Sequence, residues 1–242
     1  MNELLFIAIG LTALSLVLVA LRIGPNWLYG LVATYLIIAN LFAAKLSIVF
    51  GVVSSLSIPI YAAVFLATDA AAEHFGRKFA HRMVWIGFGA QLSLAAFGQL
   101  ITMGEPFGDP ALSDALSTVF GFVPRIVLGS FIAYLVSMHV DVRFYDYLKR
   151  RFERKYLWLR NNGSTIVSQT IDSAIFLGIA FYGVIPNLFE FFLSVLAVKL
   201  VVALFDTPFL YLSGVVVDRY GHRPRYDVDS ESGYVFDSNE GR

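Results

Sequence analysis

The sequence predicts an all-α protein, a bundle of helices that cross a membrane. Of its 242 residues, 57% are hydrophobic and only 15% are charged, whereas about a quarter of the residues of a soluble domain are charged. The apolar residues also form runs of about 20, the length that a hydrocarbon core of roughly 30 Å requires. The chain has room for about six or seven such helices and for no large soluble domain.

Seven runs are predicted to be membrane spans. They cover residues 3–21, 27–50, 57–75, 83–103, 117–140, 163–183 and 188–215. The first run carries Glu3 and no Lys or Arg ahead of its apolar stretch, which favours a retained helix over a cleaved signal peptide. The fifth span has two alternative starts, because Pro124 fits the first turn of a helix better than its middle. In the second alternative, residues 113–123 lie at the membrane interface.

The loops between these spans alternate in charge. Basic residues gather at 77–82, 143–160 and 219–225, whereas the intervening loops carry acids within 105–114 and at Glu190. The positive-inside rule therefore places the basic loops and the C-terminus in the cytoplasm, and the N-terminus outside. We expect a multi-pass protein of the plasma membrane.

The predicted organisation has three parts. An extra N-terminal helix covers residues 1–24, a transmembrane bundle covers residues 25–218, and a polar tail covers residues 219–242. The tail is rich in polar residues and is expected to be disordered.

Several classes of function find no support in the composition. The 18 basic residues balance the 18 acidic ones, which gives no indication of nucleic-acid binding. The chain has no cysteine, so disulfides and thiolate chemistry are absent. No nucleophile elbow, phosphate-binding loop or zinc-protease motif occurs. We therefore expect no catalytic residue, no metal and no cofactor.

Ionisable and amide residues occur inside the predicted spans. A charged side chain there costs about 3 kcal/mol, so such residues are rare without a function or a partner. The candidates for a functional site among them are Asn40, Lys45, Asp69, Glu73, Arg125, Gln169, Asp172, Lys199 and Asp206. One interpretation is that they form ion pairs that only hold helices together. The other is that they line an internal polar site.

The depth of these residues favours an internal site. With a rise of about 1.5 Å per residue, Asp69, Asp172 and Lys199 all fall near the middle of their spans. Neither sign of charge can face lipid there, so we expect one polar chamber between the helices. Such a chamber suits a flat, polar, neutral heterocycle, because a carboxylate accepts two parallel hydrogen bonds and aromatic rings stack on bases.

Several short motifs together resemble one family. Phe65, Asp69, Glu73 and the pair Phe75-Gly76 follow the pattern F-x3-D-x3-E-x-aromatic-G of the queuosine precursor transporter family. Other residues follow further patterns of that family. Asn40 and Lys45 follow N-x4-K, Arg125 with Gly129, Ser130 and Tyr134 follows R-x3-[GA]-S, and Gln169 and Asp172 follow Q-x2-D. Lys199 stands in the last span, where the family also has a lysine.

The resemblance implies import of 7-deazaguanines that are salvaged for tRNA modification. These are 7-cyano-7-deazaguanine, 7-aminomethyl-7-deazaguanine or queuine. The implied fold is similar to the six-helix substrate-binding components of energy-coupling-factor transporters, and the first helix is an addition to it. The implied partners are the lipid bilayer and the small 7-deazapurine, with no nucleic acid; a homodimer is left open.

The resemblance also implies the site residues. The first candidates for substrate binding are Asp69, Glu73, Arg125, Gln169, Asp172 and Lys199. The second candidates, for binding or coupling, are Asn40, Lys45, Phe65, Tyr134 and Asp206. Either Asp172 or Glu73 is expected to bind the N–H pair of the base.

Two other functions are weighed against transport. The first is a substrate-binding membrane component that needs an energising partner. The second is an intramembrane hydrolase that uses Asp69 and Asp172, for which no nucleophile or metal triad is recognisable.

Overall fold

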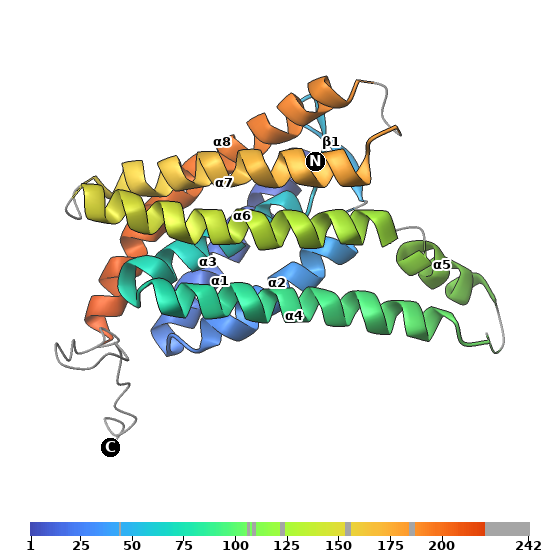
Figure 1. The fold of residues 1–242 in the computed structure, drawn as a ribbon, viewed down its shortest axis with the longest axis horizontal. Helices are drawn as coiled ribbons and strands as arrows, with labels where there is room; N and C mark the ends of the chain where they lie inside the picture. Colours follow the sequence, from blue (N-terminus) through green and yellow to red (C-terminus); the bar gives the residue numbers. More distant parts are fainter. Residues whose placement is uncertain are drawn as a thin grey trace, which may run out of the picture.

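The computed structural model describes residues 1–43, 45–105, 107, 110–121, 124–152, 156–183 and 187–220. Within these ranges the chain forms eight α-helices and one hairpin of two short strands (Figure 1). Their bounds are α1 (Asn2–Ile23), α2 (Trp27–Leu41), β1 (Leu46–Val49), β2 (Val52–Ser55), α3 (Ile58–His74), α4 (Arg77–Thr102), α5 (Pro110–Gly121), α6 (Pro124–Arg151), α7 (Leu157–Ala180) and α8 (Leu188–Arg219).

The predicted all-α class is confirmed. Three of the described helices, α1, α4 and α8, are long and apolar enough to cross a membrane. Many of their large apolar side chains are exposed on the outside of the bundle, among them Leu4, Phe97 and Leu204. Lipid tails would cover such side chains, so the chain has the surface of a membrane protein.

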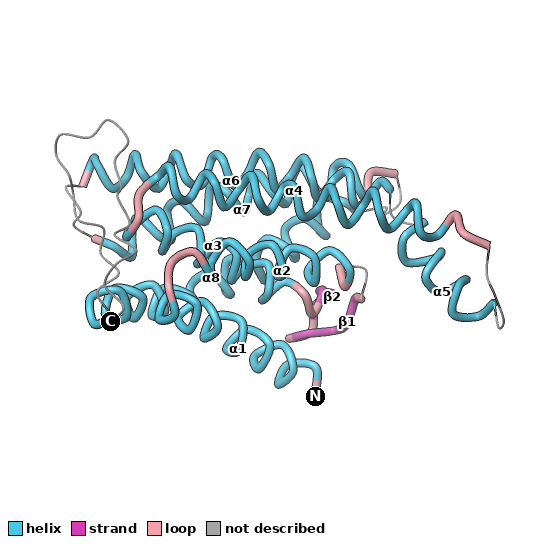
Figure 2. The backbone as a smooth tube through the Cα atoms, turned by 90° about the horizontal axis from the view of Figure 1, so that it is seen from below, coloured by secondary structure: helices cyan, strands magenta, loops and turns pink. Residues whose placement is uncertain are grey.

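Helix α3 lies at the centre of the bundle. It contacts α1, α2, α4, α6 and α8, and Figure 2 shows it between the layer of α4, α6 and α7 and the more peripheral α1. Residues 62–72 of α3 are buried throughout, and six of them are alanines. Small side chains let neighbouring backbones approach closely. Such close packing holds helices together in lipid, where the hydrophobic effect does not drive helix association.

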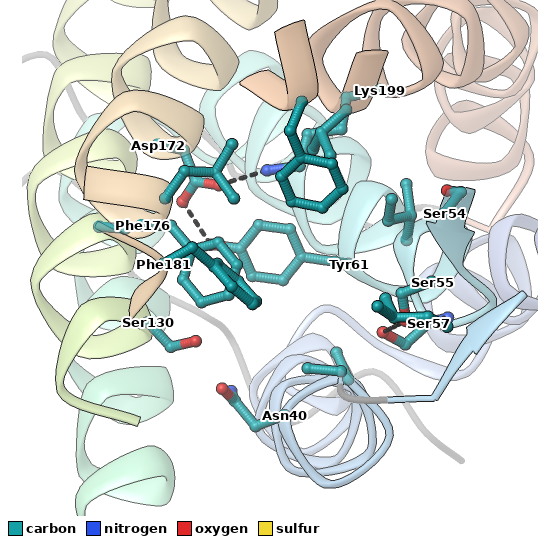
Figure 3. Close-up of a pocket in the computed structure, with 18 residues that line it drawn as sticks. Asn40, Ser54, Ser55, Ser57, Tyr61, Ser130, Asp172, Phe176, Phe181 and Lys199 are labelled. Atoms are coloured by element: carbon teal, nitrogen blue, oxygen red, sulfur yellow. Dashed lines mark hydrogen bonds and ion pairs between the residues drawn. The ribbon is translucent and has the colours of Figure 1, made fainter. Parts of the chain in front are cut away.

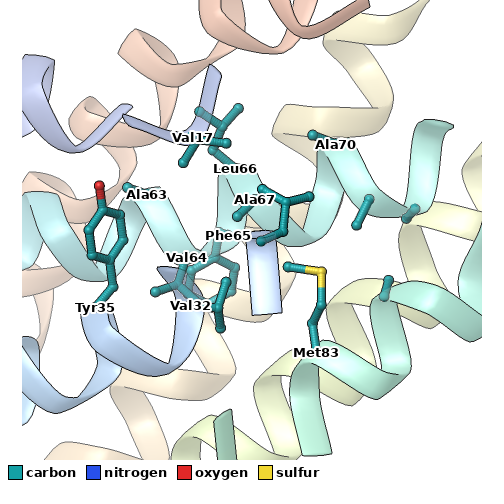
Figure 4. Close-up of a cluster of buried hydrophobic side chains, with 14 of the residues drawn as sticks. Val17, Val32, Tyr35, Ala63, Val64, Phe65, Leu66, Ala67, Ala70 and Met83 are labelled. Carbon is teal, nitrogen blue, oxygen red and sulfur yellow. The ribbon is translucent and has the colours of Figure 1, made fainter. Parts of the chain in front are cut away.

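One continuous apolar core surrounds α3. Val17 of α1, Val32 of α2 and Met83 of α4 meet Phe65 and Leu66 of α3 (Figure 4). Their side chains are at most 1% exposed. The first helix is therefore packed into the core.

The predicted second span, residues 27–50, is wrong in its second half. Helix α2 ends at Leu41, and residues 46–55 form an antiparallel hairpin. The run contains three Val and one Ile, β-branched residues that favour strands. Phe50 and Gly51, with φ of 50° and 78°, form the two-residue turn, and positive φ at both central positions gives the turn that matches strand twist.

Helix ends differ from the prediction at other places too. Helix α6 begins at Pro124 and a separate helix, α5, precedes it, which agrees with the second alternative for the fifth span. In both views α5 lies beyond one end of α4 and α6 (Figures 1 and 2). Helix α4 begins at Arg77, six residues earlier than predicted, because only Phe75 and Gly76 separate it from α3. Most of the predicted tail, residues 221–242, lies outside the described residues.

Gly87 provides a test of this packing. A Cβ at Gly87 of α4 would overlap Tyr134 of α6 and Leu36 of α2. We expect Gly87→Ala to lower the free energy of unfolding by about 1–3 kcal/mol, the usual cost of overpacking. The measurement is thermal unfolding of the purified protein in detergent. Gly89→Ala is the control, because a Cβ there meets no described atom within 4 Å. Equal melting temperatures for the two variants would contradict the packing of α4.

Candidate functional site

A cavity of about 270 Å³ opens between α2, the hairpin, α3, α6, α7 and α8 (Figure 3). Most of its wall is apolar, with a few polar groups at defined places, as is typical of small-molecule sites. The lining residues are Ala39, Asn40, Ala43, Leu46, Ser54, Ser55, Ser57, Ile58, Tyr61, Ser130, Ala133, Asp172, Phe176, Leu177, Phe181, Phe191, Val195 and Lys199.

The charged groups of this cavity are Asp172 of α7 and Lys199 of α8. The Lys199 Nζ donates to Asp172 Oδ2 at 2.5 Å, and the two residues are 2% and 7% exposed. The cavity is lined by no other charged residue among those described. The two charges therefore cancel, and this part of the cavity wall carries no net charge.

The second oxygen of Asp172 is also bonded. Tyr61 of α3 donates its hydroxyl to Asp172 Oδ1 at 2.8 Å, and Ser137 of α6 donates to the same oxygen at 3.2 Å. The Lys199 ammonium also lies 5.4 Å from the centre of the Tyr61 ring, within cation–π range. One carboxylate thus joins α3, α6, α7 and α8.

Aromatic rings form another part of the wall. Phe176 and Phe181 meet edge to face at 5.7 Å, and Phe181 meets Phe191 in the same way at 5.8 Å. Figure 3 shows Tyr61, Phe176 and Phe181 around the Asp172 carboxylate. Such rings can stack on a flat heterocycle that hydrogen-bonds the carboxylate.

Helices α6 and α7 position Asp172 through a reciprocal pair of hydrogen bonds. Ser137 of α6 donates to Asp172 of α7, while Ser168 of α7 donates to Asp141 of α6 at 2.7 Å. Each helix therefore supplies a Ser and an Asp four residues apart, which places both on one helix face. This arrangement fixes the register of α6 against α7.

A separate acidic group lies outside the cavity. Asp69 of α3, Asp141 of α6 and Asp206 of α8 are each at most 1% exposed, and none of them lines the cavity. Asp141 accepts a hydrogen bond from Ser168, whereas one oxygen of Asp69 has no hydrogen-bond partner among the described residues. Helices α3, α6 and α8 therefore each contribute a buried acid that the cavity does not include.

Glu73 belongs to a third polar group, at the end of α3. Lys149 of α6 lies 3.4 Å from the Glu73 carboxylate and donates to the backbone oxygens of Ala72 and Glu73. Tyr145 donates to the same carboxylate at 3.2 Å. Lysine at the end of a helix is favourable because it satisfies the last carbonyl groups. The predicted single chamber is thus three separate polar groups, of which one lines the cavity.

Arg125 lies away from the cavity. It is exposed at the start of α6, and its guanidinium donates to the backbone oxygens of Ile179 and Tyr182 at 2.5 and 2.6 Å. The start of the helix at Pro124 moves Arg125 out of the middle layer where the earlier start of the span would have placed it. Its contacts are those of a cap on the end of α7.

Of the remaining residues that the sequence predicts for the site, one lines the cavity and the others lie outside it. Asn40 lines the cavity, whereas Gln169 is buried outside it. Phe65 and Tyr134 are fully buried in the apolar core. Lys45 is exposed in the loop before β1, because α2 ends before reaching it.

The sequence analysis did not identify four polar residues of the cavity wall or of these groups: Tyr61, Ser54, Asp141 and Lys149. Tyr61 stands at a step of four from Phe65, which in turn precedes Asp69 by four, so helical periodicity could have indicated it. Asp141 lies just past the predicted end of the fifth span. Ser54 could not be found, because the hairpin that carries it was predicted to be helix and loop.

In the described parts of the chain, no group of three or more His, Asp or Glu residues is arranged to hold a metal ion. The cavity instead offers hydrogen bonds and stacking, which are the means of binding an organic ring.

Comparison with known proteins indicates a family. The profile of the family described as "Putative vitamin uptake transporter" matches residues 55–213. A "Probable queuosine precursor transporter" of Bacillus subtilis (strain 168) is 38% identical over 176 residues, which are 72% of this chain and 77% of that protein. The "Queuosine precursor transporter" of Escherichia coli (strain K12) is 32% identical over 120 residues, 49% of this chain and 51% of that protein. No solved structure matches the chain.

The burial of Asp69 among other acids can be tested by substitution. Asp69→Asn keeps the shape of the side chain and removes a carboxyl group that is costly to bury, so we expect little loss of stability. Asp69→Ala leaves a hole in the packed bundle and should lower the free energy of unfolding by about 1–3 kcal/mol. Thermal unfolding in detergent measures both. A larger loss for Asp69→Asn than for Asp69→Ala would contradict this account of Asp69.

Proposed function

The chain belongs to the vitamin uptake transporter family and, within it, to the queuosine precursor transporters, and from this membership and its cavity we infer that it imports queuosine precursors. It is a membrane transporter and not an enzyme. The observation that carries the binding site is the buried Asp172–Lys199 pair at the wall of a ring-sized cavity.

The proposed substrates are 7-deazaguanines such as 7-cyano-7-deazaguanine, 7-aminomethyl-7-deazaguanine or queuine. Their guanine edge presents a ring N–H and an amino group side by side, and a carboxylate accepts such a pair. The same edge carries a carbonyl oxygen, which an ammonium group can serve as donor. The Asp172 carboxylate and the Lys199 ammonium lie close enough together to do both.

Substrate binding exchanges hydrogen bonds within this group. In this structure Tyr61 and Lys199 bind the two oxygens of Asp172. The N–H pair of the base takes over those oxygens, Lys199 turns to the carbonyl, and the base stacks between Tyr61 and Phe176. Asn40 completes the wall. Asp69, Glu73, Arg125 and Gln169 act from outside the cavity, by holding the helices that form it.

We propose that α2, α3, α6 and α7 also cross the membrane, which gives a core of six helices with α1 as an addition. Helix α3 has 17 residues, about 26 Å at the usual rise per residue. Its Asp69 is buried, as are Asp141 of α6 and Asp172 of α7. Charges that turn inward leave an apolar surface for lipid.

The proposed membrane is the plasma membrane. Seven crossings put the N-terminus outside and the C-terminus in the cytoplasm, in keeping with the basic residues of the loops. The chain is proposed to carry its substrate without an energising partner. Flux into liposomes that contain only this chain would separate this function from that of a binding component.

The Asp172–Lys199 site predicts a loss of uptake on substitution. Asp172→Asn cannot accept two parallel hydrogen bonds, so we expect uptake of radiolabelled 7-cyano-7-deazaguanine to fall at least about tenfold at a limiting concentration. Tyr61→Phe removes one hydroxyl and should alter uptake about 3- to 10-fold. It also keeps the ring, so it serves as a second variant if Asp172→Asn does not reach the membrane.

Asp114→Asn is the matched control, since Asp114 is exposed on α5. Amounts of each protein in the membrane are measured alongside uptake. Wild-type uptake by both Asp172→Asn and Tyr61→Phe would contradict the proposed site.

The proposed orientation predicts which thiols are accessible. The chain has no cysteine, so each introduced one can be labelled alone. A membrane-impermeant maleimide should label Leu112→Cys of α5 in intact cells. It should label Arg150→Cys of α6 only after the cells are permeabilised, since that end of α6 faces the cytoplasm. The reverse pattern would contradict the orientation.

A further inference from the structure

The cavity has a second polar end, away from Asp172. Three serines form it: Ser54 and Ser55 of β2 and Ser57 before α3. Figure 3 shows them on the far side of Tyr61 from the Asp172 carboxylate, whereas Asn40 of α2 lies apart from them, below Tyr61. A ligand that reaches Asp172 with one edge therefore directs its opposite edge toward these groups.

Ser54 differs from its neighbours in having an unused hydroxyl. Ser55 and Ser57 hydrogen-bond each other at 2.9 Å, and Ser55 also reaches the backbone oxygen of Phe42. Ser54 is 1% exposed, lines the cavity, and its Oγ has no hydrogen-bond partner among the described residues. A buried hydroxyl without a partner is unfavourable and is uncommon in native structures.

Asn40 lines a different part of the cavity wall. Its Nδ2 donates to the backbone oxygen of Leu36 at 2.9 Å. In Figure 3 the Asn40 side chain lies below Tyr61 and apart from Ser54. The unused hydroxyl of the second polar end is therefore that of Ser54, which can donate or accept a hydrogen bond.

We propose that Ser54 binds the substituent on the five-membered ring of the substrate and so selects 7-substituted deazaguanines. This inference rests on the proposed function. With the N–H edge of the base on Asp172, the five-membered ring points away from it, and its substituent meets the second polar end. The Ser54 hydroxyl can donate to a nitrile nitrogen or accept from an aminomethyl group. Position 7 of unsubstituted 7-deazaguanine carries only a hydrogen and gains nothing from Ser54.

The test compares dissociation constants of the full-length protein for 7-cyano-7-deazaguanine and for 7-deazaguanine. Ser54→Ala should weaken binding of the cyano compound about 3- to 10-fold, the effect of one hydrogen bond. Its affinity for 7-deazaguanine should stay within about twofold of wild type. The control is Ser47→Ala, because Ser47 pairs with Ser54 across the hairpin but does not line the cavity.

The melting temperature of the ligand-free protein distinguishes a role of Ser54 in binding from a role in the fold. Ser54→Ala removes a buried hydroxyl that lacks a partner, so the ligand-free protein should be as stable as wild type or more so. A clear fall in melting temperature would mean that Ser54 serves the fold, and it would overturn the inference.

The remaining outcomes separate this inference from the proposed function. If Ser54→Ala weakens both compounds equally, or neither, Ser54 does not select the substituent and the inference fails while the proposed function stands. If the wild-type protein binds neither compound, the proposed function itself fails, and the inference with it.

Discussion

The structure depends on one constraint, that charges inside a membrane protein must find partners inside it. Lys199 and Asp172 meet this constraint with each other, at 2.5 Å and almost fully buried. Removing one partner of such a pair is costly, because it leaves an uncompensated charge. Since Tyr61 and Ser137 bind the same carboxylate, the pair also ties together four helices around the cavity.

In the proposed mode of binding, the substrate and the helix packing therefore use the same atoms of Asp172. A substrate that takes an oxygen of Asp172 from Lys199 releases a link between α7 and α8, and one that displaces Tyr61 releases a link between α7 and α3. The α6–α7 contact keeps its second hydrogen bond, from Ser168 to Asp141. A transporter has to move some helices while others stay packed. In the proposed mode of binding, α3 and α8 lose bonds to Asp172, whereas α6 and α7 stay joined.

Much of this arrangement could be predicted from the sequence, for a physical reason. The cost of a charge in lipid requires Asp69, Asp172 and Lys199 to turn inward, and all three are buried. The same rule does not say which residues become partners, since that depends on helix rotation and crossing. Glu73 thus pairs with Lys149, and Asp69 is buried away from the cavity. The hairpin was missed because an apolar run of 27–50 fits a span as well as a helix followed by a strand.

The central claim is that the base binds on the Asp172 carboxylate inside this cavity. The most direct measurement is a crystal structure of the protein with 7-cyano-7-deazaguanine. The account predicts a ligand whose ring N–H and amino group lie within hydrogen-bond distance of Asp172, with Tyr61 and Phe176 against its faces. A ligand bound elsewhere, with Asp172 still held by Lys199 and Tyr61, would contradict it.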